Sequence, residues 1–66
     1  MTNDPIADLI TRIRNATLRR ASALAVPASR LTEPLALAMV RTGFLEKVER
    51  VVDADRPVLQ ITLKYV

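Results

Sequence analysis

The amino-acid sequence predicts an α+β domain in which two helices pack on one side of a short three-stranded sheet. Two stretches repeat apolar residues at the three- and four-residue spacing of an amphipathic helix, and three shorter stretches favour strands. The order helix, strand, helix, strand, strand is typical of a small α+β domain. The predicted elements cover residues 5–18 or 5–20, 23–26, 30–42 or 33–42, 44–52 and 58–66.

The first helix is predicted to begin after Asp4, whose carboxylate can accept hydrogen bonds from the free N–H groups of the first turn. Pro5 already has the dihedral angle that the first helical position needs. Four apolar residues then form one stripe that is expected to face the core, so Ile10→Asp should unfold the domain. They are Ile6, Leu9, Ile10 and Ile13.

The short strand at residues 23–26 is followed by Pro27, which lacks a backbone donor and therefore favours the edge of a sheet. Ser29 is one candidate N-cap for the second helix. Thr32 is the alternative, and it would put Glu33 and Pro34 in the first turn, where both are favourable. Gly43 is predicted to end this helix in a left-handed conformation. The side of the helix expected to face the core carries Leu31, Leu35, Ala38 and Met39.

The last two strands should pair antiparallel through a polar loop at residues 53–57. The second of them alternates cleanly, whereas charged residues interrupt the first and leave its register open. Asp53 and Asp55 suggest paired carboxylates, but beside Arg56 they fit a turn and a solvated ion pair better. The face of the last strand expected to be buried carries Leu59, Ile61, Leu63 and Tyr65.

The composition argues against an enzyme and against a bound cofactor or metal. The 66 residues include no cysteine, no histidine and a single glycine, so the usual nucleophile–base pairs, zinc ligands and glycine-rich phosphate loops are missing. A domain of this size removes only about 60% of its surface from water, and marginal stability is expected. No apolar run approaches the roughly 20 residues needed to cross a membrane, and we expect neither a membrane partner nor a leader segment.

The charge indicates a nucleic-acid partner. Net charge is +3, and eight of the ten basic residues are arginine, whose planar guanidinium group can donate two parallel hydrogen bonds to a phosphate. Two alternatives remain: an arginine-rich composition can reflect a GC-rich genome, and Arg12 can simply pair with Asp8 one helical turn away. The candidate RNA-binding residues are Arg12, Arg14, Asn15, Ser29, Arg30 and Arg56.

Four runs of residues closely resemble one protein family, the eighth protein of the small ribosomal subunit in its bacterial and organellar form. The order and spacing of the runs fit the family, and together they cover nearly the whole chain. They are Asp4-Pro5-Ile6-Ala7-Asp8 with Thr11-Arg12-Ile13-Arg14-Asn15-Ala16, Val26-Pro27-Ala28-Ser29-Arg30-Leu31, Arg41-Thr42-Gly43-Phe44-Leu45, and Leu63-Lys64-Tyr65. Pro34 departs from the family pattern.

The resemblance implies a non-catalytic protein of the ribosome, cytoplasmic or organellar, that binds small-subunit rRNA and helps organise its central domain. Neighbouring ribosomal proteins would be further partners, and no small-molecule substrate is expected. The family protein is about twice as long, and its second half carries the main RNA contacts, so residues 1–66 resemble its N-terminal domain without the C-terminal RNA-binding domain. On that basis we expect weak RNA binding by these residues alone. The alternative is a protein-interaction domain that docks a separate chain through its sheet.

Overall fold

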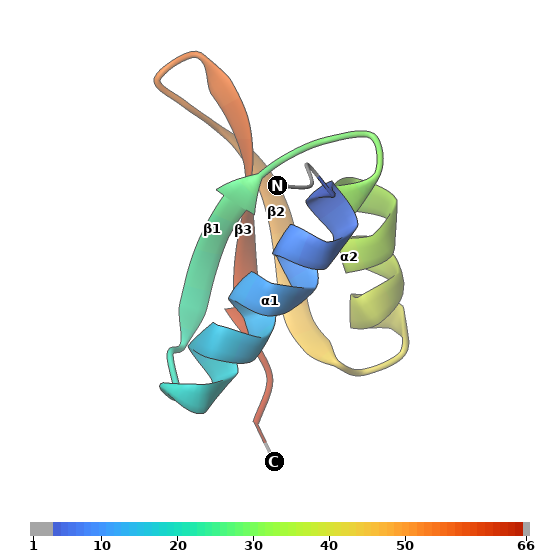
Figure 1. The fold of residues 1–66 in the computed structure, drawn as a ribbon, viewed down its shortest axis with the longest axis vertical. Helices are drawn as coiled ribbons and strands as arrows, with labels where there is room; N and C mark the ends of the chain where they lie inside the picture. Colours follow the sequence, from blue (N-terminus) through green and yellow to red (C-terminus); the bar gives the residue numbers. More distant parts are fainter. Residues whose placement is uncertain (1–3, 66) are drawn as a thin grey trace.

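The computed structural model describes residues 4–65, so the predicted end of the last strand at Val66 lies outside the described residues. The α+β prediction is confirmed, with the strands in the antiparallel order β1-β3-β2. The buried strand residues share one sheet face and form a single core with buried residues of both helices, which therefore cover the same face (Figure 1). The elements are α1 (Pro5–Leu18), β1 (Ala23–Pro27), α2 (Thr32–Arg41), β2 (Leu45–Asp53) and β3 (Arg56–Leu63).

Helix α1 begins as predicted, but its buried face differs from the predicted stripe. The Asp4 carboxylate accepts hydrogen bonds from the backbone N–H groups of Ile6 and Ala7, at 3.0 and 3.2 Å. Leu9 is only 1% exposed, whereas the neighbouring Ile10 is 44% exposed. The prediction that Ile10 faces the core is therefore wrong. The contact with the sheet follows Leu9, Ile13 and Ala16, and successive helical positions point about 100° apart, which leaves Ile10 at its edge.

The C-terminal end of α1 is closed by a left-handed residue and tied to the end of the described chain. Arg20 has φ 56°, its N–H donates to the Thr17 carbonyl (3.0 Å), and the Ala21 N–H donates to the Ala16 carbonyl (2.9 Å). This double hydrogen bond is the Schellman pattern, with arginine in place of the usual glycine. The Arg20 guanidinium lies 4.8 Å from the ring centroid of Tyr65, whose hydroxyl donates to the Ala21 carbonyl (2.6 Å).

The N-cap of α2 is Leu31, so neither Ser29 nor Thr32 is the N-cap, but both take part in hydrogen bonds at the start of the helix. The Ser29 hydroxyl accepts from the N–H groups of Leu31 (3.3 Å) and Thr32 (3.0 Å), and the Thr32 hydroxyl accepts from the Ser29 N–H (3.0 Å). The regular helix begins at Thr32, which places Pro34 in the first turn. The prediction that Leu31 faces the core is wrong, because it lies in the irregular turn before the helix and is 58% exposed. Ala36, which was not predicted, is fully buried there.

Gly43 ends α2 as predicted. Its φ is +90°, its N–H donates to the Val40 carbonyl (3.1 Å), and the next N–H, of Phe44, donates to the Met39 carbonyl (2.9 Å). Phe44 itself precedes β2 and is 72% exposed, so its assignment to the strand is wrong.

Replacing Gly43 with alanine should lower stability through backbone strain alone. A Cβ at this position would meet no atom within 4 Å, so the cost comes from the left-handed conformation, which disfavours an L-residue by roughly 1–2 kcal/mol. For a domain of this size, each 1 kcal/mol lowers the melting temperature by about 4–8 °C. Thermal unfolding of Gly43→Ala and Gly43→Asn checks the mechanism. Asparagine tolerates this conformation better, so the melting temperature of the Gly43→Asn variant should lie between those of the Gly43→Ala variant and the natural protein. Equal losses in the two variants would contradict backbone strain as the cause.

The β2–β3 hairpin is longer than predicted, and the five-residue loop at 53–57 is wrong. Asp53 already pairs with Arg56, which leaves a two-residue turn of Ala54 (φ 51°) and Asp55 (φ 63°). Left-handed conformation at both positions is the type I′ turn that matches the twist of a hairpin. The sequence did not indicate this turn, because alanine is unusual in the left-handed positions of a type I′ turn.

An irregularity near the start of β2 explains why its pattern was difficult to read. Leu45 pairs with Leu63 and Lys47 with Thr62, so Glu46 is an extra residue in the strand. The extra residue shifts the alternation, and Leu45 and Val48 both face the core. In β3 the predicted burial of Leu59, Ile61 and Leu63 is confirmed, whereas Tyr65 lies beyond the strand.

Candidate nucleic-acid interface

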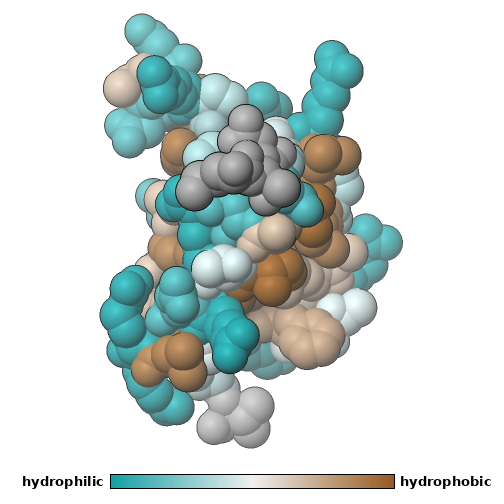
Figure 2. Space-filling view, in the orientation of Figure 1, coloured by the Kyte–Doolittle hydropathy of each residue, from teal (hydrophilic) through white to brown (hydrophobic). Residues whose placement is uncertain are grey.

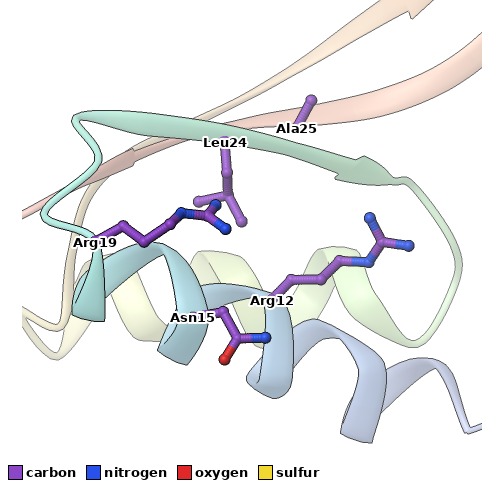
Figure 3. A pocket seen from close by; sticks show the side chains of 5 residues that line it. All are labelled: Arg12, Asn15, Arg19, Leu24 and Ala25. Carbon is purple, nitrogen blue, oxygen red and sulfur yellow. The ribbon is translucent and has the colours of Figure 1, made fainter.

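A groove of about 220 Å³ runs between α1 and the outer strand β1 (Figure 3). Three of its side chains come from α1 at positions i, i+3 and i+7, which share one helix face, and two come from β1. The lining residues are Arg12, Asn15, Arg19, Leu24 and Ala25. The groove therefore has two cations and an amide on the α1 wall and the aliphatic side chain of Leu24 on the β1 wall.

The sheet topology creates this groove. Within residues 4–65, strand β1 pairs with β3 alone and is therefore an edge strand, and its helix-facing side lies beside α1 (Figure 3). Leu24 pairs with Ile61 on the helix-facing side and packs partly buried against the core. Its side chain extends towards α1 in Figure 3, whereas the Ala25 methyl group points away from the helix. The floor of the groove is therefore Leu24, held in place by the core.

The two arginines of the groove differ in their partners. The Arg12 Nε donates to a carboxylate oxygen of Asp8 at 2.8 Å, which is the structural role considered from the sequence. Both side chains are about half exposed, so the pair contributes little to stability, and only one of the five N–H donors of the guanidinium is used. Among residues 4–65, Arg19 takes part in no ion pair. Its guanidinium lies beside Leu24 in Figure 3.

The structure brings together only two of the six predicted RNA-binding residues, Arg12 and Asn15. The others lie elsewhere: Arg14 is exposed on α1 outside the groove lining, and Arg30 is exposed in the turn before α2. Arg56 stands at the turn of the hairpin arm, which extends beyond β1 (Figure 1). The hydroxyl of Ser29, the remaining residue, accepts hydrogen bonds at the start of α2.

Sequence reasoning missed Arg19, because an arginine at the C-terminal end of a helix is already explained by the negative end of the helix dipole. The available signal was its spacing, since Arg19 follows Arg12 by seven residues and Asn15 by four. These intervals place all three side chains on one helix face. Spacing alone does not reveal that β1 lies beside that face.

Polar and apolar side chains gather on different parts of the surface in Figure 2. Hydrophilic residues cover the hairpin arm at upper left and the lower left of the molecule, and apolar residues follow the region of α2. Within residues 4–65, no three His, Cys, Asp or Glu side chains gather as a metal site. Neither helix of the described chain is long and apolar enough to cross a membrane.

Comparison with known proteins identifies the family. The family model described as Ribosomal protein S8 matches residues 4–66. The small ribosomal subunit protein uS8 of Thermoanaerobacter sp. (strain X514) is 44% identical over 62 residues, and the same protein of Bacillus cytotoxicus is 47% identical over 62 residues. Each match covers 94% of this chain and 47% of the relative, so the chain spans about half the length of these curated relatives. The sequence, the α+β fold and these matches together show that the chain belongs to the ribosomal protein S8 family.

Proposed function

We propose that this protein is a non-catalytic component of the small ribosomal subunit that binds rRNA through the groove between α1 and β1. The observation that carries the proposal is the presence of Arg12, Asn15 and Arg19 on one helix face in a chain of this family. Guanidinium groups neutralise phosphates, and an amide side chain fixes orientation by binding sugars or bases. The location would be the ribosome, with neighbouring ribosomal proteins as further partners and a contribution to the central domain of the RNA.

The other basic residues extend this proposed surface. Arg14 and Arg30 are exposed, and Arg56 lies at the turn of the hairpin arm, so each can reach a separate phosphate. Ser29 remains a weaker candidate, because RNA would compete with the hydrogen bonds that its hydroxyl accepts at the start of α2. The proposed contacts are thus spread over several sites, with the groove as the centre.

A second candidate function is docking of another protein chain on the sheet face away from the helices. Val51 and Val58 pair across β2 and β3 on that face and remain partly exposed. Lys47 and Glu49 form an ion pair (3.1 Å) on the same face of β2. Apolar contacts through this face would depend weakly on salt.

A salt titration distinguishes the two candidate functions. Binding to a hairpin of small-subunit rRNA, measured by fluorescence anisotropy, should weaken steeply from 50 to 200 mM salt because counterions are released from neutralised phosphates. Replacing Arg19 with glutamine should reduce the slope of log affinity against log salt by about one. An affinity that does not change with salt would contradict RNA binding through these arginines.

A further inference from the structure

The groove has a feature that phosphate binding does not require, namely its aliphatic floor. A phosphate gains from cations and N–H donors but not from contact with a leucine side chain. Leu24 is partly buried, packs against the core and still lines the groove between Arg12 and Arg19. An aliphatic floor flanked by planar cations suits a flat, partly apolar ring with polar edges.

The size of the groove fits one such ring. A closed cavity of about 150 Å³ holds a benzene molecule, and this groove measures about 220 Å³. A volume of this order accommodates a single base. A paired base within a duplex does not offer its face to such a groove, so the occupant has to be unstacked.

The polar residues on the rim supply the remaining contacts that a nucleotide needs. Asn15 carries both a donor and an acceptor, the combination that recognises the edge of a base. The guanidinium of Arg19 lies beside Leu24, and that of Arg12 lies towards the other end of the groove (Figure 3). Guanidinium planes stack on bases and also bind phosphate, so the two arginines can serve both parts of one nucleotide.

We infer that the groove binds a single unpaired nucleotide of RNA, with its base over Leu24 between Arg12 and Arg19 and with Asn15 at the base edge. The inference rests on the proposed function and narrows it, because it names an unstacked nucleotide and not the duplex backbone as the ligand of this groove.

The first test compares two small probes by NMR. The isotope-labelled chain is titrated at low salt with adenosine 5′-monophosphate and, separately, with ribose 5-phosphate, which has the same sugar and phosphate but no base. The expected result is that the nucleotide shifts the amide signals of Asn15, Leu24 and Ala25 with an affinity several-fold higher than that of ribose 5-phosphate. Equal affinities would overturn the inference, showing a phosphate site only, and would leave the proposed function standing. Absence of shifts at these residues with both probes would also overturn it.

The second test uses RNA. A hairpin with one unpaired adenosine should bind several-fold more tightly than the same hairpin fully paired. Asn15→Ala, which leaves the charge unchanged, should remove this preference while retaining salt-dependent binding to the paired hairpin. Gln60→Ala is the matched control, because it removes another exposed amide from the sheet face away from the helices.

The outcomes separate the inference from the proposed function. If the two hairpins bind equally well with a steep salt dependence, the nucleotide site is wrong and RNA binding stands. If Gln60→Ala removes the preference as completely as Asn15→Ala, the groove is not its source and the inference fails. If neither hairpin binds at low salt, the proposed function fails as well.

Discussion

Replacing Leu9 with aspartate is expected to unfold the protein, whereas the same substitution at the adjacent Ile10 is expected to leave it folded. Leu9 is 1% exposed in the centre of the core, while Ile10 is 44% exposed. Removing a buried leucine side chain already costs about 2–5 kcal/mol, and burying a carboxylate adds to that loss. A chain of this length has a total stability of only about 3–10 kcal/mol.

Circular dichroism at 25 °C and thermal melting provide the measurement. The Ile10→Asp variant is a closely matched control, because it makes the same chemical change one residue away in the same helix. A folded Leu9→Asp variant together with an unfolded Ile10→Asp variant would show that α1 packs on the sheet through the opposite edge of its apolar stripe.

Reversing both arginines of the groove, Arg12→Glu with Arg19→Glu, is expected to reduce affinity for small-subunit RNA by on the order of a hundredfold. A hydrogen bond to a charged group contributes roughly 1.5 kcal/mol, and each 1.4 kcal/mol changes affinity about tenfold. Both side chains are exposed, so the fold should be retained. Fluorescence anisotropy at 50 mM salt measures the loss, and circular dichroism checks the fold.

The matched control reverses two exposed arginines outside the groove lining, Arg41 and Arg50. This double variant has the same net charge as the groove variant, so the comparison separates position from total charge. We expect the control to lose several-fold less affinity. Equal losses would indicate that the overall charge, and not the groove, attracts RNA.

The elements that could be predicted from the sequence are those set by local chemistry. Asp4 and Pro5 determine where α1 begins, Gly43 ends α2, and the alternation of β3 identifies its buried face. These features depend on a helix cap, on one glycine in a left-handed conformation and on the alternation of apolar and polar residues along a strand. Each can be recognised within a few residues of the sequence.

What could not be predicted depends on contacts between elements. The four apolar residues at the start of α1 are compatible with more than one orientation of the helix about its axis. Packing against the sheet selects the orientation in which Ile10 is exposed. Ala36 escaped prediction because its small side chain carries a weak hydrophobic signal, although it is fully buried in α2. Arg12 and Asn15 could be proposed from the sequence, whereas the groove also needs Leu24, which the pairing of β1 with β3 holds beside α1.

The strand order also predicts the order in which the three strands pair during folding. Strand β3 lies between β1 and β2, so every pairing in the sheet requires the strand that comes third of the three along the chain. The two-residue turn lets β2 and β3 close locally, whereas joining Ala23 to Thr62 closes a loop of nearly 40 residues at greater entropic cost. We therefore expect β1 to join a preformed hairpin, and hydrogen exchange should show its amides opening at lower free energy than those of β2 and β3. Because Leu24 belongs to β1, the groove between α1 and β1 would form only when β1 docks on the hairpin.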